Sequence, residues 1–239
     1  MIAQFKKMFY LGRDNLFIKT ISDEYINWLS FANAGMLHRG NIYAIRFAIE
    51  NLPSTKPVLE IGSFCGLSTN VISYFLSDQG KENRIFSCDK WLFENAENGG
   101  NLGDSKISHQ QYHEFVKSNF LRNVEFFSSN NKPYTIESFS DEFFELWKKE
   151  ETVDDVFGRN IKLGGEISFC YVDGNHTYEF AKRDFNNVDQ HLEVGGYILF
   201  DDSSDDDPFG LTRLMNEIKS KKNYDLVMRN PNYLFKKLP

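Results

Sequence analysis

Apolar and polar residues alternate along the chain between two kinds of pattern. Short apolar runs predict strands, and longer stretches with apolar residues three or four apart predict helices. Five strands are predicted in this way, at 56–61, 83–89, 123–129, 166–173 and 197–202. Five helices are predicted between and after them, at 67–79, 108–120, 136–150, 178–192 and 208–221. Strands that alternate with helices are typical of a mostly parallel sheet with helices on both faces.

The two ends of the chain depart from this alternation. The last two short strands are separated by Asn230-Pro231-Asn232, a connection too short for a parallel crossover, so they are expected to form an antiparallel hairpin. Two amphipathic helices, at 22–33 and 41–51, precede the first strand. We therefore predict a doubly wound α/β sheet of seven strands. An N-terminal helical cap (1–55) and the ligand-binding part (56–239) are expected to form a single domain.

Two polar stretches interrupt the pattern. Residues 90–107 are rich in asparagine and glycine and directly follow a strand that ends near Asp89. A polar segment that begins at the carboxyl edge of a sheet is suited to a mobile lid. Residues 151–165 are interpreted as a solvated surface connector.

A glycine turn follows the first strand. The segment VLEIGSFCGLST places Gly62 and Gly66 between an apolar run and a helix, which is how α/β folds hold nucleotide-like ligands. Phe64 stands where the dinucleotide fingerprint has its second glycine, so a ligand without a pyrophosphate fits better. Glu60 in the strand would repel phosphate and attract a cation or an amine. Asp89, at the end of the next strand, is placed to accept hydrogen bonds from a ribose. Adenosine with a cationic, phosphate-free tail describes S-adenosylmethionine (SAM).

A second segment extends this interpretation. The run YVDGNHTYEF is followed by a helix, by Gly195-Gly196 and by a strand that closes in Asp201-Asp202. With the glycine turn and Asp89, it resembles the class I SAM-dependent methyltransferases, and in particular the macrocin-type small-molecule O-methyltransferases, over residues 56–237. The resemblance implies a Rossmann-like methyltransferase fold and methylation of a small hydroxylated molecule, such as a sugar or a natural-product intermediate.

The resemblance also implies which residues hold the cofactor. Asp89 would bind the ribose, Trp91 would stack near the adenine, and Ser128 or Ser129 would contact the adenine. The full set of implied cofactor-binding residues is Glu60, Gly62, Ser63, Phe64, Gly66, Ser68, Asp89, Trp91, Ser129 and Asp173.

An alcohol is a poor nucleophile at neutral pH, so the acceptor needs a base or a divalent ion. His176, three residues after Asp173, is the best candidate base. Asp173, Asp201 and Asp202 match the positions at which metal-dependent relatives hold Mg²⁺, an ion that prefers oxygen ligands. Asn175 stands where those relatives often have an acid, so both routes stay open.

Composition limits the partners and the location. The chain has 239 residues and a formal net charge of −7, which argues against nucleic acid as a partner. Three cysteines without C-x-x-C spacing indicate reduced thiols and a cytoplasmic protein. We find no signal peptide and no apolar run long enough to cross a membrane. Aromatic residues in the cap would allow a homodimer.

Two other functions remain open at this point. The first is a non-catalytic protein that binds SAM or S-adenosylhomocysteine (SAH) on the same fold. The second is a nucleotide-dependent oxidoreductase, against which Phe64 argues. The sequence leaves the acceptor and the methylated atom, oxygen or nitrogen, undecided.

Overall fold

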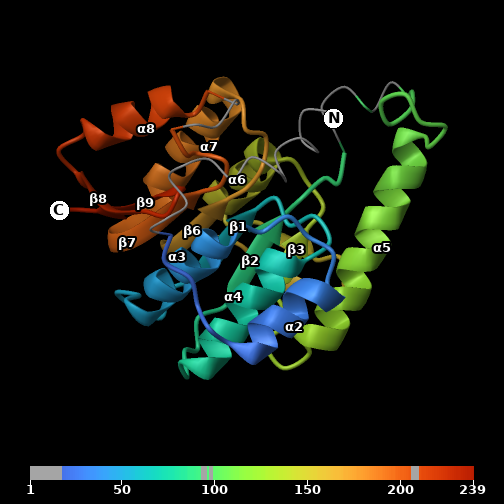
Figure 1. Cartoon of the computed structure of the whole chain (residues 1–239), viewed down its shortest axis with the longest axis horizontal. Coiled ribbons are helices and arrows are strands. Elements are labelled where there is room, and N and C mark those ends of the chain that lie inside the picture. The colour runs from blue at the N-terminus through green and yellow to red at the C-terminus, as the bar shows by residue number, and fades with distance from the viewer. Residues whose placement is uncertain (1–17, 93–95, 97–98, 206–209) are drawn as a thin grey trace.

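Seven strands form one sheet in the order β3-β2-β1-β6-β7-β9-β8 (Figure 1). The computed structural model describes residues 18–92, 96, 99–205 and 210–239. The strands of the sheet are β1 (Val58–Ile61), β2 (Ile85–Cys88), β3 (Tyr134–Ile136), β6 (Ile167–Val172), β7 (Leu192–Phe200), β8 (Tyr224–Arg229) and β9 (Tyr233–Lys237). The first five are parallel, whereas β9 runs antiparallel to both β7 and β8. The predicted doubly wound sheet with an antiparallel C-terminal hairpin is confirmed.

Parallel pairing brings the ends of five strands to the same edge. β1 lies in the middle of the sheet, where Glu60 is level with Ser87 of β2 and Tyr171 of β6. β1, β2 and β6 are buried along their whole length, which explains their nearly continuous apolar sequence. Residues that directly follow β1, β2, β3, β6 and β7 therefore meet at one carboxyl edge.

Helices cover both faces of the sheet (Figure 1). One face carries α2 (Glu24–Ala32), α3 (Arg39–Glu50) and α4 (Leu67–Asp78), and the other carries α6 (Ser140–Lys148), α7 (Tyr178–His191) and α8 (Thr212–Lys219). The long helix α5 (His109–Phe127) lies beside the β3 end of the sheet. Ile45 and Ile49 of α3 are fully buried in one hydrophobic cluster with Phe169 of β6. The helices of the predicted cap thus share the core of the sheet.

The predicted strand at 123–129 is wrong, because α5 continues to Phe127. Val116, Phe120 and Val124 are buried four residues apart on one face of this helix, and this helical spacing outweighs the β propensity of the local residues. The third strand is instead the three-residue β3, which lies between the predicted strand 123–129 and the predicted helix 136–150 and overlaps that helix only at Ile136. A strand this short has no readable alternation.

The polar segment 151–165 is not an irregular connector. It contains a two-stranded antiparallel hairpin of β4 (Thr152–Asp154) and β5 (Asn160–Lys162). Asp155 holds its turn by accepting hydrogen bonds from the N–H groups of Phe157 and Arg159. Parts of the predicted lid (93–95 and 97–98) and the start of the predicted helix at 208–221 lie outside the described residues. In the part of the chain that is described, no helix has the length and apolarity to cross a membrane.

Candidate functional site

The turn after β1 forms the first part of the site. Gly62 and Gly66 have φ angles of 82° and 87°, in the left-handed region that favours glycine. A side chain at Gly62 would also lie 2.1 Å from the carbonyl oxygen of Asp173. The N–H of Gly66 donates to the carbonyl of Ser63 at 2.7 Å, and α4 begins at the next residue. Residues 62–66 thus form a tight turn at the carboxyl edge, which we call the glycine loop.

Asp89, which follows β2, shapes this loop. Its Oδ2 accepts hydrogen bonds from the N–H groups of Ser63 (2.7 Å) and Phe64 (2.8 Å), and its Oδ1 accepts one from Trp91 (2.6 Å). Burial raises the pKa of Asp89, although the three N–H donors oppose this shift. A carboxylate has about four accepting positions, so one is left for a ligand. That Asp89 binds the ribose stays a prediction, whereas its hydrogen bonds to the glycine loop are observed in the structure.

Trp91 also contacts the glycine loop. Its indole Nε1 donates to the carbonyl of Phe64 at 2.9 Å, and its ring packs against Phe120 of α5 with centroids 5.2 Å apart. The side chain is buried. Trp91 therefore supports the loop, and its stacking on adenine stays a prediction.

Glu60 lies beneath the loop in β1, with no exposed surface. Thr69 donates its hydroxyl to Glu60 Oε2 at 2.5 Å. The other oxygen, Oε1, is buried without a hydrogen-bond partner. Burial raises the pKa of Glu60 to about 7, while hydrogen bonds from Ser68 and Thr69 and the charge of Asp89 are smaller influences. The buried carboxyl therefore binds a proton more readily than an exposed glutamate does.

We expect Glu60→Gln to change how stability depends on pH. The folded protein holds the Glu60 proton more tightly than the unfolded chain does, so this carboxyl lowers the unfolding free energy as the pH rises from about 4.5 to about 7. A neutral amide removes this effect. The variant should be more stable than the wild type above pH 7, by up to about 3 kcal/mol, and lose this advantage near pH 5. Urea unfolding at several pH values measures the difference, and parallel pH profiles would contradict the prediction.

Three unsatisfied polar atoms lie near the same edge, although another, Asn83 Oδ1, lies before β2 at the opposite edge. Among the described residues, Glu60 Oε1, Ser63 Oγ and Ser138 Oγ are buried without hydrogen-bond partners, and they lie in or just after β1 and β3. Buried polar atoms rarely stay unpaired in native proteins, and a polar ligand would supply partners. A small cavity of about 20 Å³ is lined by Ser63, Phe64, Ser68 and Asp173, together with Gly35, Met36, Leu37 and Leu67. At about 20 Å³ the cavity has room for about one water molecule, so the amino-acid end of SAM can bind beside these residues only after segment 35–37 moves.

A histidine and two aspartates form the second part of the site. His176 Nε2 lies 3.7 Å from Asp173 Oδ1 and 3.6 Å from Asp202 Oδ2. Asp173 follows β6, and Asp202 lies two residues after the end of β7. Two neighbouring strand ends therefore bring both carboxylates to one imidazole. The carboxylates can orient the ring and stabilise its protonated form.

Asp201 occupies a more buried position beside this group. Its Oδ1 accepts hydrogen bonds from the amides of Asn41 (2.5 Å) and Asn232 (2.8 Å). Burial, followed by the neighbouring Asp201 carboxylate, raises the pKa of Asp173 well above its usual range. Burial also raises the pKa of Asp201. Both carboxyls therefore bind a proton more readily than an exposed aspartate does.

This arrangement does not fit a Mg²⁺ site. One oxygen of Asp201 is already bonded to two amides, which leaves fewer carboxylate oxygens for an ion. Within the described ranges, no group of three or more His, Cys, Asp or Glu residues is placed to hold a metal. We therefore derive no step through a metal, and the predicted ligand set of Asp173, Asp201 and Asp202 is not supported by its geometry.

Ser129 is not brought to the site as predicted. It is exposed in the turn after α5, because the predicted strand 123–129 is in fact the end of α5 and this turn. Ser128 is buried and donates its hydroxyl to Asn70 Oδ1 at 2.6 Å. The residue that follows β3 is Glu137, which accepts hydrogen bonds from His113 Nε2 (2.9 Å) and Lys117 Nζ (2.5 Å). Burial opposes the shift, but these hydrogen bonds lower the pKa of Glu137.

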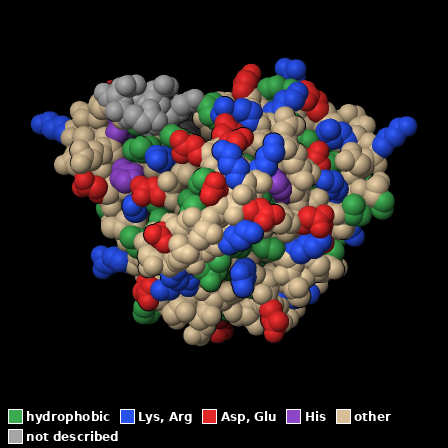
Figure 2. Space-filling model, turned by 180° about the vertical axis from the view of Figure 1, so that it is seen from behind, with side chains coloured by type: hydrophobic (Ala, Val, Ile, Leu, Met, Phe, Trp, Pro, Cys, Tyr) green, Lys and Arg blue, Asp and Glu red, His purple; other side chains and the backbone are tan. Residues whose placement is uncertain are grey.

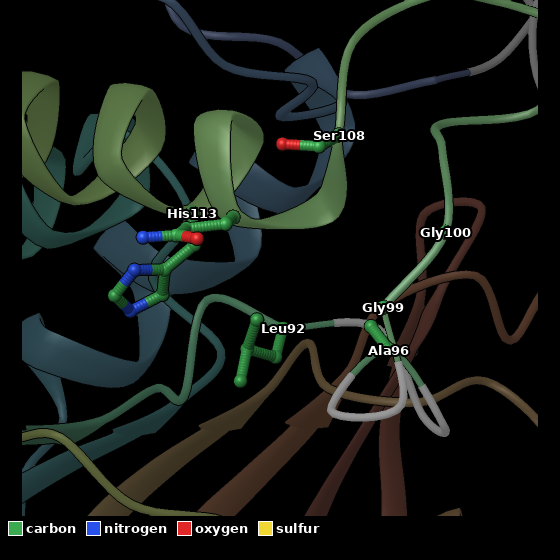
Figure 3. A pocket seen from close by; sticks show the side chains of 7 residues that line it. Leu92, Ala96, Gly99, Gly100, Ser108 and His113 are labelled. Carbon is green, nitrogen blue, oxygen red and sulfur yellow. The ribbon is translucent and has the colours of Figure 1, made fainter.

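A larger cavity of about 370 Å³ adjoins this corner of the sheet edge. Figure 3 shows it between the segment after β2, which carries Leu92, and the first turns of α5, which carry Ser108 and His113. Gly99 and Gly100 line its other side. Its volume lies in the range that small-molecule ligands occupy.

Sequence reasoning missed the asparagines and Glu137. Asn41 and Asn232 reach Asp201 from α3 and from the turn between β8 and β9, and no sequence spacing connects them. Glu137 was hidden by the wrong position of the third strand. A polar residue directly after a correctly placed β3 would have identified it.

Comparison with known proteins assigns the family. A family model described as a methyltransferase domain matches residues 59–203, more than half of the chain. The chain belongs to this family, and the resemblance to class I SAM-dependent methyltransferases is confirmed. The match includes the glycine loop, Asp89 and the His176 group, but neither α2 and α3 nor the C-terminal hairpin. The oxidoreductase alternative is thereby set aside.

Solved structures with the same fold are methyltransferases. An O-methyltransferase from Bacillus cereus, in complex with SAH, has a TM-score of 0.55 and 12% identity, over 100% of this chain and 97% of that chain. TomG from Streptomyces achromogenes is an O-methyltransferase involved in tomaymycin synthesis and was solved with SAM. It has a TM-score of 0.53 and 12% identity, over 95% of this chain and 94% of that chain. The SAH-bound methyltransferase PaMTH1 from Podospora anserina has a TM-score of 0.57 and 12% identity, over 99% of this chain and 96% of that chain. No curated protein matches the chain by sequence.

Proposed function

We propose that this protein transfers the methyl group of SAM to a hydroxyl group of a small molecule. The observation that carries the proposal is the meeting of two sites at one sheet edge. Ser63, Phe64 and Asp173 line a cavity beside the glycine loop, and Asp173 also contacts His176. Asp173 would thus lie between the bound methyl donor and His176, the proton acceptor. That structural neighbours include O-methyltransferases solved with SAM or SAH supports the same reaction.

His176 is the proposed proton acceptor. SAM, when bound, would supply a methyl group on a sulfonium, and the neutral thioether SAH would leave as the methyl group passes to the acceptor oxygen. The protein has to align the acceptor oxygen in line with that methyl group and remove its proton. His176 takes the proton, and Asp173 and Asp202, within 3.7 Å of its Nε2, stabilise the imidazolium that forms.

The proposed acceptor is a small molecule. The acceptor would have to lie beside His176, whereas the cavity of about 370 Å³ near Leu92 and His113 has none of the His176 group among its described lining residues. On the face seen in Figure 2, acidic and basic side chains are interspersed. The described residues of that face therefore carry no continuous basic field, and the net charge is −7. Both features disfavour a nucleic-acid acceptor.

Location and assembly belong to the same proposal. All three cysteines, Cys65, Cys88 and Cys170, are free and buried, as expected for a protein of the reducing cytoplasm. The homodimer stays a prediction. Trp28 and Phe31 of α2 are exposed apolar side chains of the cap that would favour it.

Calorimetric titration with SAM and SAH is the first test of this function. We expect micromolar binding of both, followed by transfer of label from [methyl-¹⁴C]SAM to a small-molecule extract of source cells that lack the protein. Tight binding of SAH without any transfer would favour the non-catalytic alternative. Failure to bind either compound would contradict the proposed function altogether.

A further inference from the structure

The glycine loop is held in a conformation that its own sequence does not favour. Phe64 has a φ angle of 44°, in a region where residues with a Cβ are strained. Such a conformation persists only where the surroundings hold it in place. Asp89 and Trp91 hold the peptide groups of Ser63 and Phe64, as described above. The next peptide group of the loop, the carbonyl of Cys65, is held separately.

Two side-chain amides from distant parts of the chain donate to the Cys65 carbonyl. Asn33 Nδ2, at the end of α2, lies 3.0 Å from this oxygen, and Asn123 Nδ2 of α5 lies 2.8 Å from it. Both donors are directed at one oxygen of the turn that the cofactor would contact. The Cys65 carbonyl of the loop is therefore hydrogen-bonded both from the end of α2 and from α5.

Asn33 is itself fixed by a chain of buried hydrogen bonds. Its Oδ1 accepts from Asn70 Nδ2 at 2.7 Å, and Asn70 Oδ1 accepts from the Ser128 hydroxyl at 2.6 Å. Asn33 and Asn70 are each only 1% exposed. The chain connects α2 through α4 to the end of α5, so the amide of Asn33 cannot turn away without breaking several bonds.

The segment after Asn33 covers the cofactor cavity. Gly35, Met36 and Leu37 line this cavity together with Ser63 and Phe64. A side chain at Gly35 would lie 2.4 Å from Leu67 Cβ, so this segment lies directly on the start of α4. Residues 33–37 precede the matched methyltransferase domain, which starts at residue 59. The cofactor site thus includes a part of the chain that the family model does not cover.

We propose that Asn33 and Asn123 are positioning residues for the cofactor: they hold the Cys65 carbonyl and keep the glycine loop in its binding conformation before SAM arrives. The inference rests on the proposed function, because SAM is its ligand. A loop that is already ordered loses less conformational entropy on binding. Neither residue touches the cofactor in this scheme, and each acts through the loop.

The test uses SAH, so it needs no acceptor. Removing one donor leaves the carbonyl with the other, whereas removing both leaves a buried carbonyl unpaired. Asn33→Ala and Asn123→Ala should each weaken SAH binding about fivefold, and the double variant should exceed the product, about twenty-fivefold. Asn33→Asp keeps the volume and the acceptor for Asn70 but loses both donors. Asn33→Asp should weaken SAH binding as much as Asn33→Ala, and it replaces Asn33→Ala in the test if the alanine variant does not fold.

Asn83→Ala is the matched control. Asn33 donates to two backbone carbonyls, those of Ala34 (2.8 Å) and Cys65. Asn83 is likewise 1% exposed and donates to two, those of Ser54 (2.9 Å) and Lys56 (2.6 Å). It lies just before β2, away from the carboxyl edge. Its removal should lower the melting temperature as Asn33→Ala does, with the SAH affinity unchanged. A purely structural role for Asn33 would give both variants the same SAH affinity.

Calorimetry separates the outcomes. Equal SAH affinity in the wild type, Asn33→Ala and Asn83→Ala would overturn the positioning role. Tighter binding by Asn33→Ala would also overturn it, because Asn33 would then hold the site shut. Failure of the wild type to bind SAH would instead contradict the proposed function. Coupling between Asn33 and Asn123, with Asn83→Ala binding normally, is the result that we expect.

Discussion

Asp89→Ala is expected to weaken SAH binding by about a hundredfold or more. The carboxylate accepts hydrogen bonds from three backbone N–H groups, two of them in the glycine loop. Hydrogen bonds to a charged group contribute about 1.5–3 kcal/mol each, and the strained Phe64 has no other partner for its N–H among the bonds observed here. Losing the carboxylate therefore releases the loop and also removes the predicted ribose contact. Isothermal titration with SAH measures the change.

Two further variants make the Asp89 result specific. Asp89→Asn keeps an oxygen for Ser63 and Phe64 but turns an amide towards Trp91, so we expect an intermediate loss of about tenfold. Asp155→Ala is the matched control, because Asp155 is also buried and also accepts from two backbone N–H groups of a turn, the one between β4 and β5. It should cost stability and leave SAH affinity unchanged. SAH binding by Asp89→Ala within threefold of the wild type would refute both roles of Asp89.

His176→Asn is expected to lower the rate of methyl transfer by about 10²–10⁴-fold, the usual contribution of a positioned base. The asparagine retains a similar shape but cannot take a proton. Because His176 does not line the cavity at the glycine loop, SAH affinity should stay within twofold. Transfer of label from [methyl-¹⁴C]SAM to the cell extract described above measures the rate, and titration with SAH measures the affinity.

His191→Asn is the control for this experiment. His191 is the last residue of α7, the helix that His176 precedes, and it lies at the opposite end of that helix. Its replacement should leave transfer unchanged. Transfer by His176→Asn within tenfold of the wild type would place the base elsewhere. Transfer that depends on added Mg²⁺ in both the wild type and the variant would assign deprotonation to a metal and show that the aspartates rearrange to bind it.

The hydrogen bonds of Asp89 and Asp201 differ from what their sequence positions suggest. Each acid follows a strand of the sheet, where a ligand or metal role is expected. In the folded chain, most of the accepting capacity of Asp89 is used by backbone N–H groups, and one oxygen of Asp201 is used by two amides. Both acids therefore stabilise the site, and only their remaining hydrogen-bond accepting positions are available to a ligand.

The sequence by itself determined the alternation of strands and helices, and with it the parallel sheet, the glycine loop and the edge at which Asp89, Asp173, His176 and Asp202 meet. These features are local: a strand followed by Gly62 and Gly66 can be read within ten residues. The prediction of the third strand was wrong for two reasons. A strand of three residues is too short to show an alternating pattern, and α5 occupies most of the predicted position. Ser129 was lost with it, and Glu137 was overlooked.

Only the tertiary structure decided which side chains hold the site together. Four asparagines, from the end of α2, from α3, from α5 and from the C-terminal turn, reach Cys65 or Asp201 across 31 to 160 residues of chain: Asn33, Asn41, Asn123 and Asn232. An asparagine in a helix looks like a surface residue until the fold places a carbonyl or a carboxylate within 3 Å of its amide. Such bonds depend on where elements pack rather than on spacing along the chain, and for that physical reason they cannot be read from the sequence.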